Sequence, residues 1–273
     1  MTNDLQGKVA LITGSAGGIG LGIAQAFAEE GVKLALADID EAALAEAAAG
    51  LRESGAEVIA LPLDVTDRTQ WEAAVTVVES FLGPVQLLFN NAGVSTLGMG
   101  IEDVTTRIWD QVVAINLTGV YNGIHFVLEG MRAAGGGHIV NTASMGGLAG
   151  FPKLSPYSAT KAAVIALSEA LDVELAPEGI RVSVLAPGGV RSRLWRTSRK
   201  VRGLPDTEVP PDDGSAQSAG PGGMDPYEVG RRVVAGVRND DRYIFTHPEA
   251  RPLLVQRFDR MLHDLDAADA FVV

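Results

Sequence analysis

The sequence predicts a single α/β domain in which helices cover both faces of a central parallel sheet of about seven strands, in a doubly wound arrangement. Two observations lead to this prediction. Short apolar runs alternate with longer segments of helical periodicity, and the runs are nearly continuous in apolar residues, as in strands buried on both faces. The length of 273 residues is within the range in which one α/β domain is common.

The first part of the chain predicts the pattern βαβα. The apolar run Val9–Thr13 predicts the first strand, and the periodic segment after it predicts a helix that ends near Glu30. Lys33–Asp38 predicts the second strand. Glu41–Ser54 predicts the next helix, because the alanines at 42–49 favour helix over low-complexity coil.

The same alternation continues through the middle of the chain. The expected elements are a strand at 57–64, a helix at about 67–81, a strand at 85–90, two helical stretches through about 132, a strand at 138–144, a helix from 155 to about 175 and a strand at 180–186. Six strands joined by helical crossovers indicate a doubly wound fold of the Rossmann type.

The regular pattern stops between about residues 190 and 225. This segment is rich in Gly, Pro, Asp and Ser and has few periodic apolar positions, so we expect a variable substrate loop or lid. A helix at about 226–237, a short strand at 243–246 and a helix at about 248–265 follow. There is no internal repeat and no separate second domain, so residues 1–273 are expected to form one domain.

The composition argues against several classes of partner. A formal charge of −12 argues against broad binding to nucleic acid or to an anionic membrane, because phosphate contacts need clustered cations. No run reaches the ~18 apolar residues of a membrane span, and no signal-peptide pattern is present. The chain has no cysteine and its four histidines lack metal-ligand spacing, so no metal site is expected. We expect a cytoplasmic protein.

The pair Tyr157 and Lys161 is the most informative feature of the chain. Residues four apart share a helix face. A free tyrosine titrates near ~10, so a phenol that exchanges protons at neutral pH needs a nearby cation to stabilise its phenolate. Lys161 supplies such a cation, and the pair predicts the acid/base group of an enzyme. The alternative is a half-buried tyrosine beside a solvated lysine.

The glycine-rich segment Thr13–Gly20 lies between the first expected strand and the first expected helix. Glycines at such a turn let the backbone approach a pyrophosphate, which the unpaired N–H groups of the helix N-terminus attract. The alternative is a turn whose glycines serve only tight packing. The position in the strand–helix unit favours a dinucleotide site.

Asp38 ends the second expected strand, as far past the glycines as the acidic residue that binds an adenosine ribose in dinucleotide-binding folds. Its carboxylate predicts NAD as cofactor, since it would repel the 2′-phosphate of NADP, and Ile39 and Asp40 bring no cation. The alternative is that Asp38 only caps the next helix.

Beyond these features, the chain carries further motifs that resemble those of the short-chain dehydrogenase/reductase family, and the resemblance covers nearly the whole chain. Thr13–Gly20 is similar to its cofactor loop, Asp64-Val65 to its adenine-contacting pair, Asn90–Gly93 to its fourth-strand motif and Pro187–Val190 to its nicotinamide-holding turn. Ser192 stands where many members have threonine, and it keeps a hydroxyl. Four residues match the catalytic tetrad in order and approximate spacing: Asn116, Ser144, Tyr157 and Lys161.

The resemblance and the residue patterns together give a set of expected cofactor contacts. This set is Gly14, Ser15, Gly18, Ile19, Gly20, Asp38, Ile39, Asp64, Val65, Asn91, Ala92, Gly93, Tyr157, Lys161, Pro187, Gly188, Val190 and Ser192.

Hydride transfer between an alcohol carbon and a nicotinamide requires a proton to leave or join the oxygen. We expect Tyr157 to move that proton, Lys161 to lower the pKa of Tyr157, and Ser144 to hydrogen-bond the substrate oxygen. The resemblance implies that Lys161 also binds the nicotinamide ribose and that Asn116 holds a water connecting Lys161 to solvent. An alternative for Asn116 is a helix-bending hydrogen bond to backbone.

The substrate is expected at the carboxyl ends of the strands, where the chain is largely apolar. The expected substrate contacts are Leu97, Met145, Phe151, Leu154 and Trp195. Such a pocket indicates a hydrophobic secondary alcohol or ketone, for example an aromatic, alicyclic or terpenoid compound. The alternative is that several of these side chains only pack the lid.

A basic stripe is expected where Arg193, Arg196, Arg199 and Arg202 recur every three residues, if that segment is helical. Such a stripe could receive a carboxylate, a phosphate or an acyl-thioester carrier, although a solvated face is the commoner explanation.

Three functions remain open from sequence. The first is an NAD-dependent secondary alcohol dehydrogenase that also works as a carbonyl reductase. The second is an NADPH-dependent ketoreductase acting on an acyl-thioester or anionic substrate, against which Asp38 counts. The third is a cofactor-sensing or scaffold protein, which would not need Ser144, Tyr157 and Lys161 together. The resemblance also implies a homodimer or homotetramer formed through the helices of Asn116 and Tyr157, and the helix of Tyr157 is apolar on several faces, which something must bury.

Overall fold

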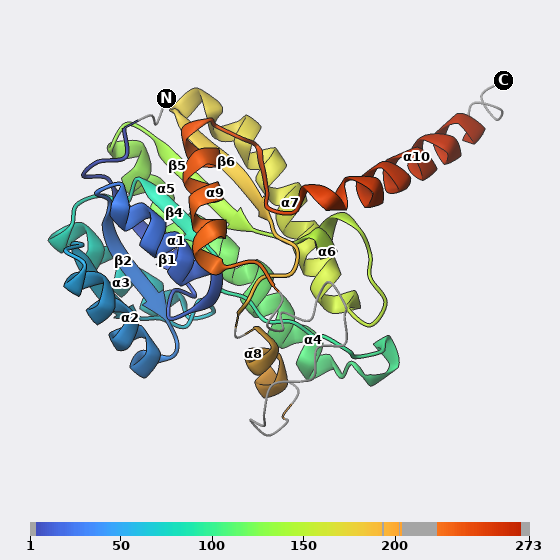
Figure 1. Ribbon diagram of the computed structural model, residues 1–273, viewed down its shortest axis with the longest axis horizontal. Coiled ribbons are helices and arrows are strands. Elements are labelled where there is room, and N and C mark those ends of the chain that lie inside the picture. The colour runs from blue at the N-terminus through green and yellow to red at the C-terminus, as the bar shows by residue number, and fades with distance from the viewer. Residues whose placement is uncertain (1–3, 193, 202, 204–222, 269–273) are drawn as a thin grey trace.

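The computed structural model describes residues 4–192, 194–201, 203 and 223–268. Among them, seven parallel strands form one sheet in the order β3-β2-β1-β4-β5-β6-β7 (Figure 1). The strands are β1 (Val9–Thr13), β2 (Lys33–Asp38), β3 (Val58–Pro62), β4 (Leu87–Asn90), β5 (Gly137–Thr142), β6 (Ile180–Ala186) and β7 (Tyr243–Phe245). The chain reverses its direction of travel across the sheet between β1 and β4, and this switch point is where doubly wound folds bind ligands.

Helices cover both faces of the sheet. The α-helices are α1 (Gly18–Glu29), α2 (Glu41–Glu53), α3 (Arg68–Phe81), α4 (Thr106–Val113), α5 (Gly119–Ala133), α6 (Met145–Leu148), α7 (Ser155–Leu175), α8 (Leu194–Val201), α9 (Pro226–Arg238) and α10 (Arg251–Ala268). A π-helical turn, Ala114–Thr118, joins α4 to α5. Short 3₁₀ turns lie at Ile101–Asp103, Ala176–Glu178 and Pro248–Ala250.

Alternating side chains of each strand divide the core into two layers. In β1, Val9 and Leu11 pack with α3, α5 and α7, whereas Ala10 and Ile12 pack with α1, α2 and α9. All four side chains are buried. Because helices cover both faces of the strand, its sequence is a nearly continuous run of apolar residues. Such runs, alternating with helical segments, are what predicted a parallel sheet.

The structure confirms the predicted α/β sandwich and differs from the predicted elements in three places. The helical stretch around Asn116 includes the π-helical turn, and α6 follows β5 directly. The expected loop over about 190–225 contains α8, while residues 204–222 lie outside the described part of the chain. The helix α8 packs on α4 through Val201, which is buried beside Met99, Ile108 and Val112.

The last helix leaves the body of the molecule. Figure 1 shows α10 projecting away from the sheet, and none of its residues is buried. One contact near its start is a hydrogen bond from Arg257 to the carbonyl of Leu148. No helix in the described ranges is long and apolar enough to cross a membrane.

Candidate active site

A cavity of about 750 Å³ opens at the carboxyl ends of the strands. All seven strands contribute to its wall through residues at or just after their carboxyl ends, which lie within the segments 14–19, 38–40, 63–65, 91–97, 142–146, 187–192 and 247–253, although not every residue of these segments lines the cavity. Helices α4, α7 and α8 add further residues, Tyr157 and Lys161 among them. The cavity is therefore at the position where doubly wound sheets bind ligands.

The glycine loop forms one wall of this cavity. Gly14, Ala16, Gly17, Gly18 and Ile19 line it. The N-cap of α1 is Gly17, and no side chain accepts a hydrogen bond from the first N–H groups of this helix. Those groups are thus available to an anion, as a pyrophosphate site requires.

Two residues of the loop that were expected to contact the cofactor do not line the cavity. The Ser15 hydroxyl is buried and donates to the carbonyl of Ala37 at 3.2 Å, which ties the loop to β2. Gly20 packs so closely on the loop that a Cβ there would collide with the carbonyl of Gly14. Their role in the structure is to hold the loop in shape.

Asp38 reaches the cavity from the end of β2. One carboxylate oxygen accepts from the backbone N–H of Ala16 at 3.0 Å and the other from that of Asp40 at 3.0 Å. The cap of α2 is Asp40, whose side chain accepts from Ala43 at 3.2 Å. The capping alternative for Asp38 is therefore wrong, and its carboxylate is fixed facing the cavity.

The adjoining cavity wall is acidic as well. Ile39, Asp40, Asp64 and Val65 line it beside Asp38. The carboxylate of Asp64 accepts from the N–H and the hydroxyl of Thr66 at 2.9 and 2.8 Å, which holds this turn after β3. No Lys or Arg contributes to the cavity wall from the described segments 38–40 and 63–65.

The segment after β4 is bonded to the glycine loop. The Asn91 amide donates to the carbonyls of Thr13 and Gly14 at 3.0 and 3.2 Å, and the Thr13 hydroxyl accepts from the N–H groups of Asn91 and Ala92. Asn91, Ala92 and Gly93, which were expected to contact the cofactor, line the cavity. Much of the hydrogen-bonding capacity of Asn91 is thus used to hold two walls together.

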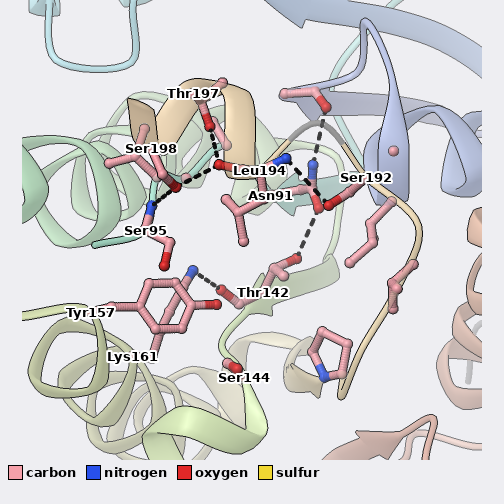
Figure 2. Close-up of a pocket in the computed structure, with 18 of the residues that line it drawn as sticks. Asn91, Ser95, Thr142, Ser144, Tyr157, Lys161, Ser192, Leu194, Thr197 and Ser198 are labelled. Carbon is pink, nitrogen blue, oxygen red and sulfur yellow. Dashed lines mark hydrogen bonds between the residues drawn. The ribbon is translucent and has the colours of Figure 1, made fainter. Parts of the chain in front are cut away.

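Tyr157, Lys161 and Ser144 share the wall of the cavity opposite α8 (Figure 2). The Lys161 ammonium is buried, donates to the carbonyl of Thr142 at 2.6 Å, and lies 5.7 Å from the centre of the Tyr157 ring. Ser144 caps α6 by accepting from the N–H of Gly146 at 3.0 Å. A phenol, a hydroxyl and an ammonium thus converge on one end of the cavity.

Burial perturbs both titratable groups of this wall. Burial raises the pKa of the Tyr157 phenol, and a hydrogen bond with Ser144 offsets part of the increase. Burial also lowers the pKa of Lys161, from 10.5 to about 8. The direction for Tyr157 differs from the expected lowering of its pKa by Lys161, because loss of hydration on burial is the largest effect on the phenol.

Asn116 does not line the cavity, although it was placed with the catalytic residues. It lies in the π-helical turn and is fully buried. Its amide donates to the carbonyl of Val94 at 2.8 Å and to the Thr160 hydroxyl at 3.2 Å, and its oxygen accepts from the N–H of Val94 at 2.8 Å. The side chain bonds to backbone outside its own helix, so the helix-bending alternative is also wrong.

The turn after β6 closes the cavity on the side of β7. The cavity wall here includes four residues that were expected to contact the cofactor: Pro187, Gly188, Val190 and Ser192. The carbonyl of Pro187 accepts from the N–H of Met145 at 3.0 Å. The Ser192 hydroxyl accepts from the N–H of Leu194 at 3.3 Å, at the start of α8.

Four of the five expected substrate contacts, Leu97, Met145, Phe151 and Leu154, line the cavity. Trp195 belongs to α8, but its side chain lies outside the described part of the structure. The N–H of Ser95 donates to the Ser198 hydroxyl at 3.1 Å, which fixes α8 across the mouth of this apolar end (Figure 2).

The expected basic stripe is only partly described. Arg193 and Arg202 lie outside the described residues, and Arg199 is not part of the cavity wall. Arg196 lines the cavity one helical turn before Lys200, which also lines it. No group of three or more residues with metal-ligating side chains occurs in the described ranges.

Sequence reasoning missed several lining residues, among them Gln111, Ile115, Thr142, His247, Glu249 and Leu253. Thr142 and His247 lie at or just beyond the carboxyl ends of β5 and β7. The strand-end rule that indicated the other walls would therefore have found them. Gln111 and Ile115 project from α4 and the π-helical turn, and no strand-end argument reaches them.

Comparison with known proteins agrees with this geometry. The family model for short chain dehydrogenases matches residues 8–203. The chain is 35% identical to a C alpha-dehydrogenase of Sphingobium sp., with 95% of this chain and 87% of the relative covered. It is 37% identical to a 3-alpha-(or 20-beta)-hydroxysteroid dehydrogenase of Mycobacterium tuberculosis, with 89% of this chain and 87% of the relative covered.

A solved structure resembles the whole chain. A short chain dehydrogenase/reductase from Burkholderia phymatum, crystallised in complex with NAD, superposes with a TM-score of 0.87 at 31% identity, and the match covers 96% of each chain. The sheet order, the glycine loop and the converging tyrosine, lysine and serine are thus accompanied by similarity along nearly the entire sequence. The chain belongs to the short-chain dehydrogenase/reductase family of oxidoreductases.

Proposed function

We propose that the protein is an NAD-dependent oxidoreductase that interconverts a hydrophobic secondary alcohol and its ketone. The observation that carries the proposal is that Tyr157, Lys161 and Ser144 line the same cavity as the glycine loop and the Asp38 carboxylate. This cavity extends from the end of β2 to α7, and so it suits a dinucleotide together with a small substrate. A cofactor sensor would have no use for the three converging polar groups.

The fit of a dinucleotide is supported from two sides. The uncapped N-terminus of α1 offers N–H groups for a pyrophosphate. Asp38, held by Ala16 and Asp40, offers a carboxylate for ribose hydroxyls. When bound, the nicotinamide supplies the hydride acceptor or donor of the reaction.

In the proposed reaction, Tyr157 takes the proton from the alcohol oxygen during oxidation and returns it during reduction. Ser144 hydrogen-bonds that oxygen and holds it against Tyr157. The Lys161 ammonium stabilises the phenolate, and its bond to the Thr142 carbonyl keeps it in place. Asn116 holds the Val94 backbone and the Thr160 side chain, and so supports the wall from which Tyr157 projects.

The choice of NAD over NADP rests on charge. Asp38, Asp40 and Asp64 line the end of the cavity assigned to the adenosine. A 2′-phosphate placed there would meet carboxylates, which would repel it. A ribose with free hydroxyls would instead donate hydrogen bonds to Asp38.

The substrate class is proposed from the apolar end of the cavity. Leu97, Met145, Phe151 and Leu154 would bury the carbon skeleton of an aromatic, alicyclic or terpenoid alcohol. The name of one relative above, a hydroxysteroid dehydrogenase, is in line with a bulky alicyclic alcohol. We further propose a cytoplasmic homodimer or homotetramer, which light scattering against the monomer mass of 28.5 kDa would test.

A second candidate is an NADPH-dependent ketoreductase acting on an acyl-thioester or another anionic substrate. The observation that favours it is the presence of Arg196 and Lys200 in the cavity wall. Asp38 argues against the NADPH part of this alternative.

The decisive experiment follows nicotinamide absorbance with a panel of apolar secondary alcohols, with NAD and NADP offered in parallel. Turnover with NAD that is lost in Tyr157→Phe supports the first proposal. Turnover with NADP alone contradicts the cofactor assignment. Turnover only with acyl-thioester or carboxylate substrates favours the second candidate.

A further inference from the structure

His247 stands directly beyond β7 and lines the cavity. Its ring meets the turn after β6, whose residues Pro187, Gly188 and Val190 line the same cavity. The N–H of Gly188 lies 3.1 Å from the ring Nδ1, and the carbonyl of Gly189 lies 3.2 Å from Nε2. Both nitrogens of one imidazole therefore bond to consecutive residues of a single backbone turn.

The partners of His247 determine which ring nitrogen carries the proton. The backbone N–H of Gly188 can only donate, so Nδ1 must accept and carries a lone pair. The Thr246 hydroxyl, 2.7 Å from the same Nδ1, is then a second donor to it. The carbonyl of Gly189 can only accept, so Nε2 carries the proton. The neutral ring with its proton on Nε2 satisfies all three contacts at once.

The turn is also held sterically by this ring. A Cβ at Gly188 would lie 2.8 Å from Cγ of His247, so the backbone at Gly188 approaches the imidazole more closely than any other residue would allow. On its other sides the turn is held by the N–H of Met145, which donates to the Pro187 carbonyl, and by the N–H of Met224, which donates to the Gly189 carbonyl. His247 supplies the contact between this turn and the segment after β7.

The position of the turn in the sheet relates it to one half of a dinucleotide. In a doubly wound fold each half of the sheet binds one mononucleotide, and the two meet at the switch point. Asp38, the last residue of β2, and Asp64, just beyond β3, mark the adenosine half. The turn follows β6, in the half that also contains Ser144, Tyr157 and Lys161. The nicotinamide half therefore lies against the turn that His247 holds.

We propose that His247 is a positioning residue that fixes the turn Pro187–Val190 and thereby sets the place of the nicotinamide relative to Tyr157. This inference rests on the dinucleotide binding proposed above. His247 takes no part in proton transfer, because its two nitrogens are both engaged by backbone groups. Its effect is on where one half of the cofactor rests.

The inference separates two ligands that differ only in their nicotinamide. ADP-ribose contains the adenosine, the pyrophosphate and the second ribose but no nicotinamide ring. His247→Ala is expected to raise the Kd of NADH about tenfold, as loss of the two bonds that hold the turn would do. The Kd of ADP-ribose is expected to change less than twofold. Fluorescence titration for NADH and calorimetry for ADP-ribose measure the two constants.

Two conservative variants sharpen the experiment. His247→Asn offers an oxygen near the Nδ1 position, and His247→Gln offers a donor near the Nε2 position, so each is expected to restore part of the NADH affinity. His263→Ala, in the exposed helix α10, removes a histidine from the same end of the chain and is expected to change neither constant. Equal weakening of both ligands in His247→Ala, or no weakening of NADH, would overturn the inference.

A measurement on the unmodified protein keeps the test independent of whether the variants fold. In ¹⁵N spectra of histidine-labelled protein near pH 8, His247 is expected to show a proton on Nε2 and none on Nδ1, and the opposite tautomer would overturn the inference. Failure of wild-type protein to bind either NADH or ADP-ribose would instead contradict the proposed function. The two failures are therefore distinguishable.

Discussion

The Nζ of Lys161 lies one helical turn from Tyr157 on α7, 5.7 Å from the centre of its ring, and donates to the Thr142 carbonyl at 2.6 Å. The carbonyl, at the end of β5, holds the ammonium at a fixed place within the cavity wall. The same burial that lowers the pKa of Lys161 to about 8 raises that of Tyr157. Burial and the hydrogen bond with Ser144 act on the pKa of the phenol in opposite directions, and we expect the neighbouring ammonium to lower it as well, so that it balances part of the effect of burial.

Replacing Lys161 by methionine tests this balance. For alcohol oxidation the phenolate is the reactive form, so kcat/KM rises with pH through the pKa of Tyr157. Removing a cation from beside a phenol raises its pKa, by about one to three units for groups this close. The rising limb of the pH profile is therefore expected to move to higher pH. A profile that falls in height without moving would contradict a role of Lys161 in tuning Tyr157.

A matched control for this variant is Lys33→Met, which removes a lysine that pairs with Glu57 on the surface at 3.4 Å. It is expected to leave the pH profile unchanged. In the unliganded protein the ammonium of Lys161 is present below about pH 8, its pKa, and is lost above that value. The profiles are therefore recorded from about pH 6, where the ammonium is present, up to the plateau of each protein, so that a displaced limb is told apart from a lowered one.

Asp38→Asn tests the choice of cofactor. The asparagine oxygen can still accept from one of the two backbone N–H groups, but the negative charge is removed. A hydrogen bond to a charged group contributes about 1.5–3 kcal/mol, so the ratio of kcat/KM for NAD over NADP is expected to fall about 10- to 100-fold. Steady-state kinetics with both cofactors measures the ratio.

The control for the Asp38 variant is Asp67→Asn. Asp67 caps α3 by accepting from Thr69 and Gln70, and it does not line the cavity. The Asp67→Asn variant loses one negative charge, as Asp38→Asn does, but away from the cavity. Its ratio of kcat/KM for NAD over NADP is therefore expected to match that of the wild type. An unchanged ratio in Asp38→Asn would show that the carboxylate does not select the cofactor.

Asn116→Ala separates a structural role from a role in carrying water. The variant leaves the N–H and the carbonyl of Val94 without their side-chain partner in a buried place. Each buried polar group left unpaired costs about 1–3 kcal/mol, so the free energy of unfolding in urea is expected to fall by a few kcal/mol. Normal stability with slow proton exchange at the active site would instead support the water-carrying role that sequence resemblance implied.

The sequence predicted the sheet well because a strand that is buried on both faces is a continuous run of apolar residues, which is easily recognised. Strand β1, for example, is apolar from Val9 to Ile12, and β2 ends at Asp38 as expected, since a carboxylate is not placed deep in such a sheet. Helix α7 was predicted with its observed bounds, because Pro156 stands in its first turn, where a proline is tolerated, and a long helical segment follows.

The candidate site could be predicted in its residues but only partly in its contacts. Sequence placed Asn116 with the catalytic groups, yet its amide is occupied by Val94, a partner 22 residues away that no local pattern reveals. The gap of 59 residues between Gly188 and His247 hides their contact in the same way. The helix α8 was missed since its apolar positions are few, and its place depends on packing against α4.

The last prediction concerns His138, a buried histidine in β5, at the end of the sheet opposite the cavity. Its Nε2 lies 2.7 Å from the Ser183 hydroxyl, which itself donates to the Asp241 carbonyl, so Nε2 carries a proton. Burial lowers the pKa of His138 from 6.5 to about 4, against the opposing effect of Asp240. The folded state therefore resists protonation that the unfolded chain accepts.

The consequence is a loss of stability as the pH falls from about 6.5 towards 4, because in that window the unfolded chain binds more protons than the folded protein. The contribution of His138 to the free energy of unfolding is fully present above pH 6.5 and amounts to about 3 kcal/mol, at 1.36 kcal/mol per pKa unit.

Urea unfolding of wild type and His138→Gln at pH 7, 6 and 5 measures this contribution, with His263→Gln in the exposed helix α10 as control. The wild type is expected to lose more stability between pH 7 and 5 than His138→Gln does. A difference between the two proteins that is independent of pH would contradict the burial of a neutral histidine, since only a group with unlike pKa values in the two states makes stability depend on pH.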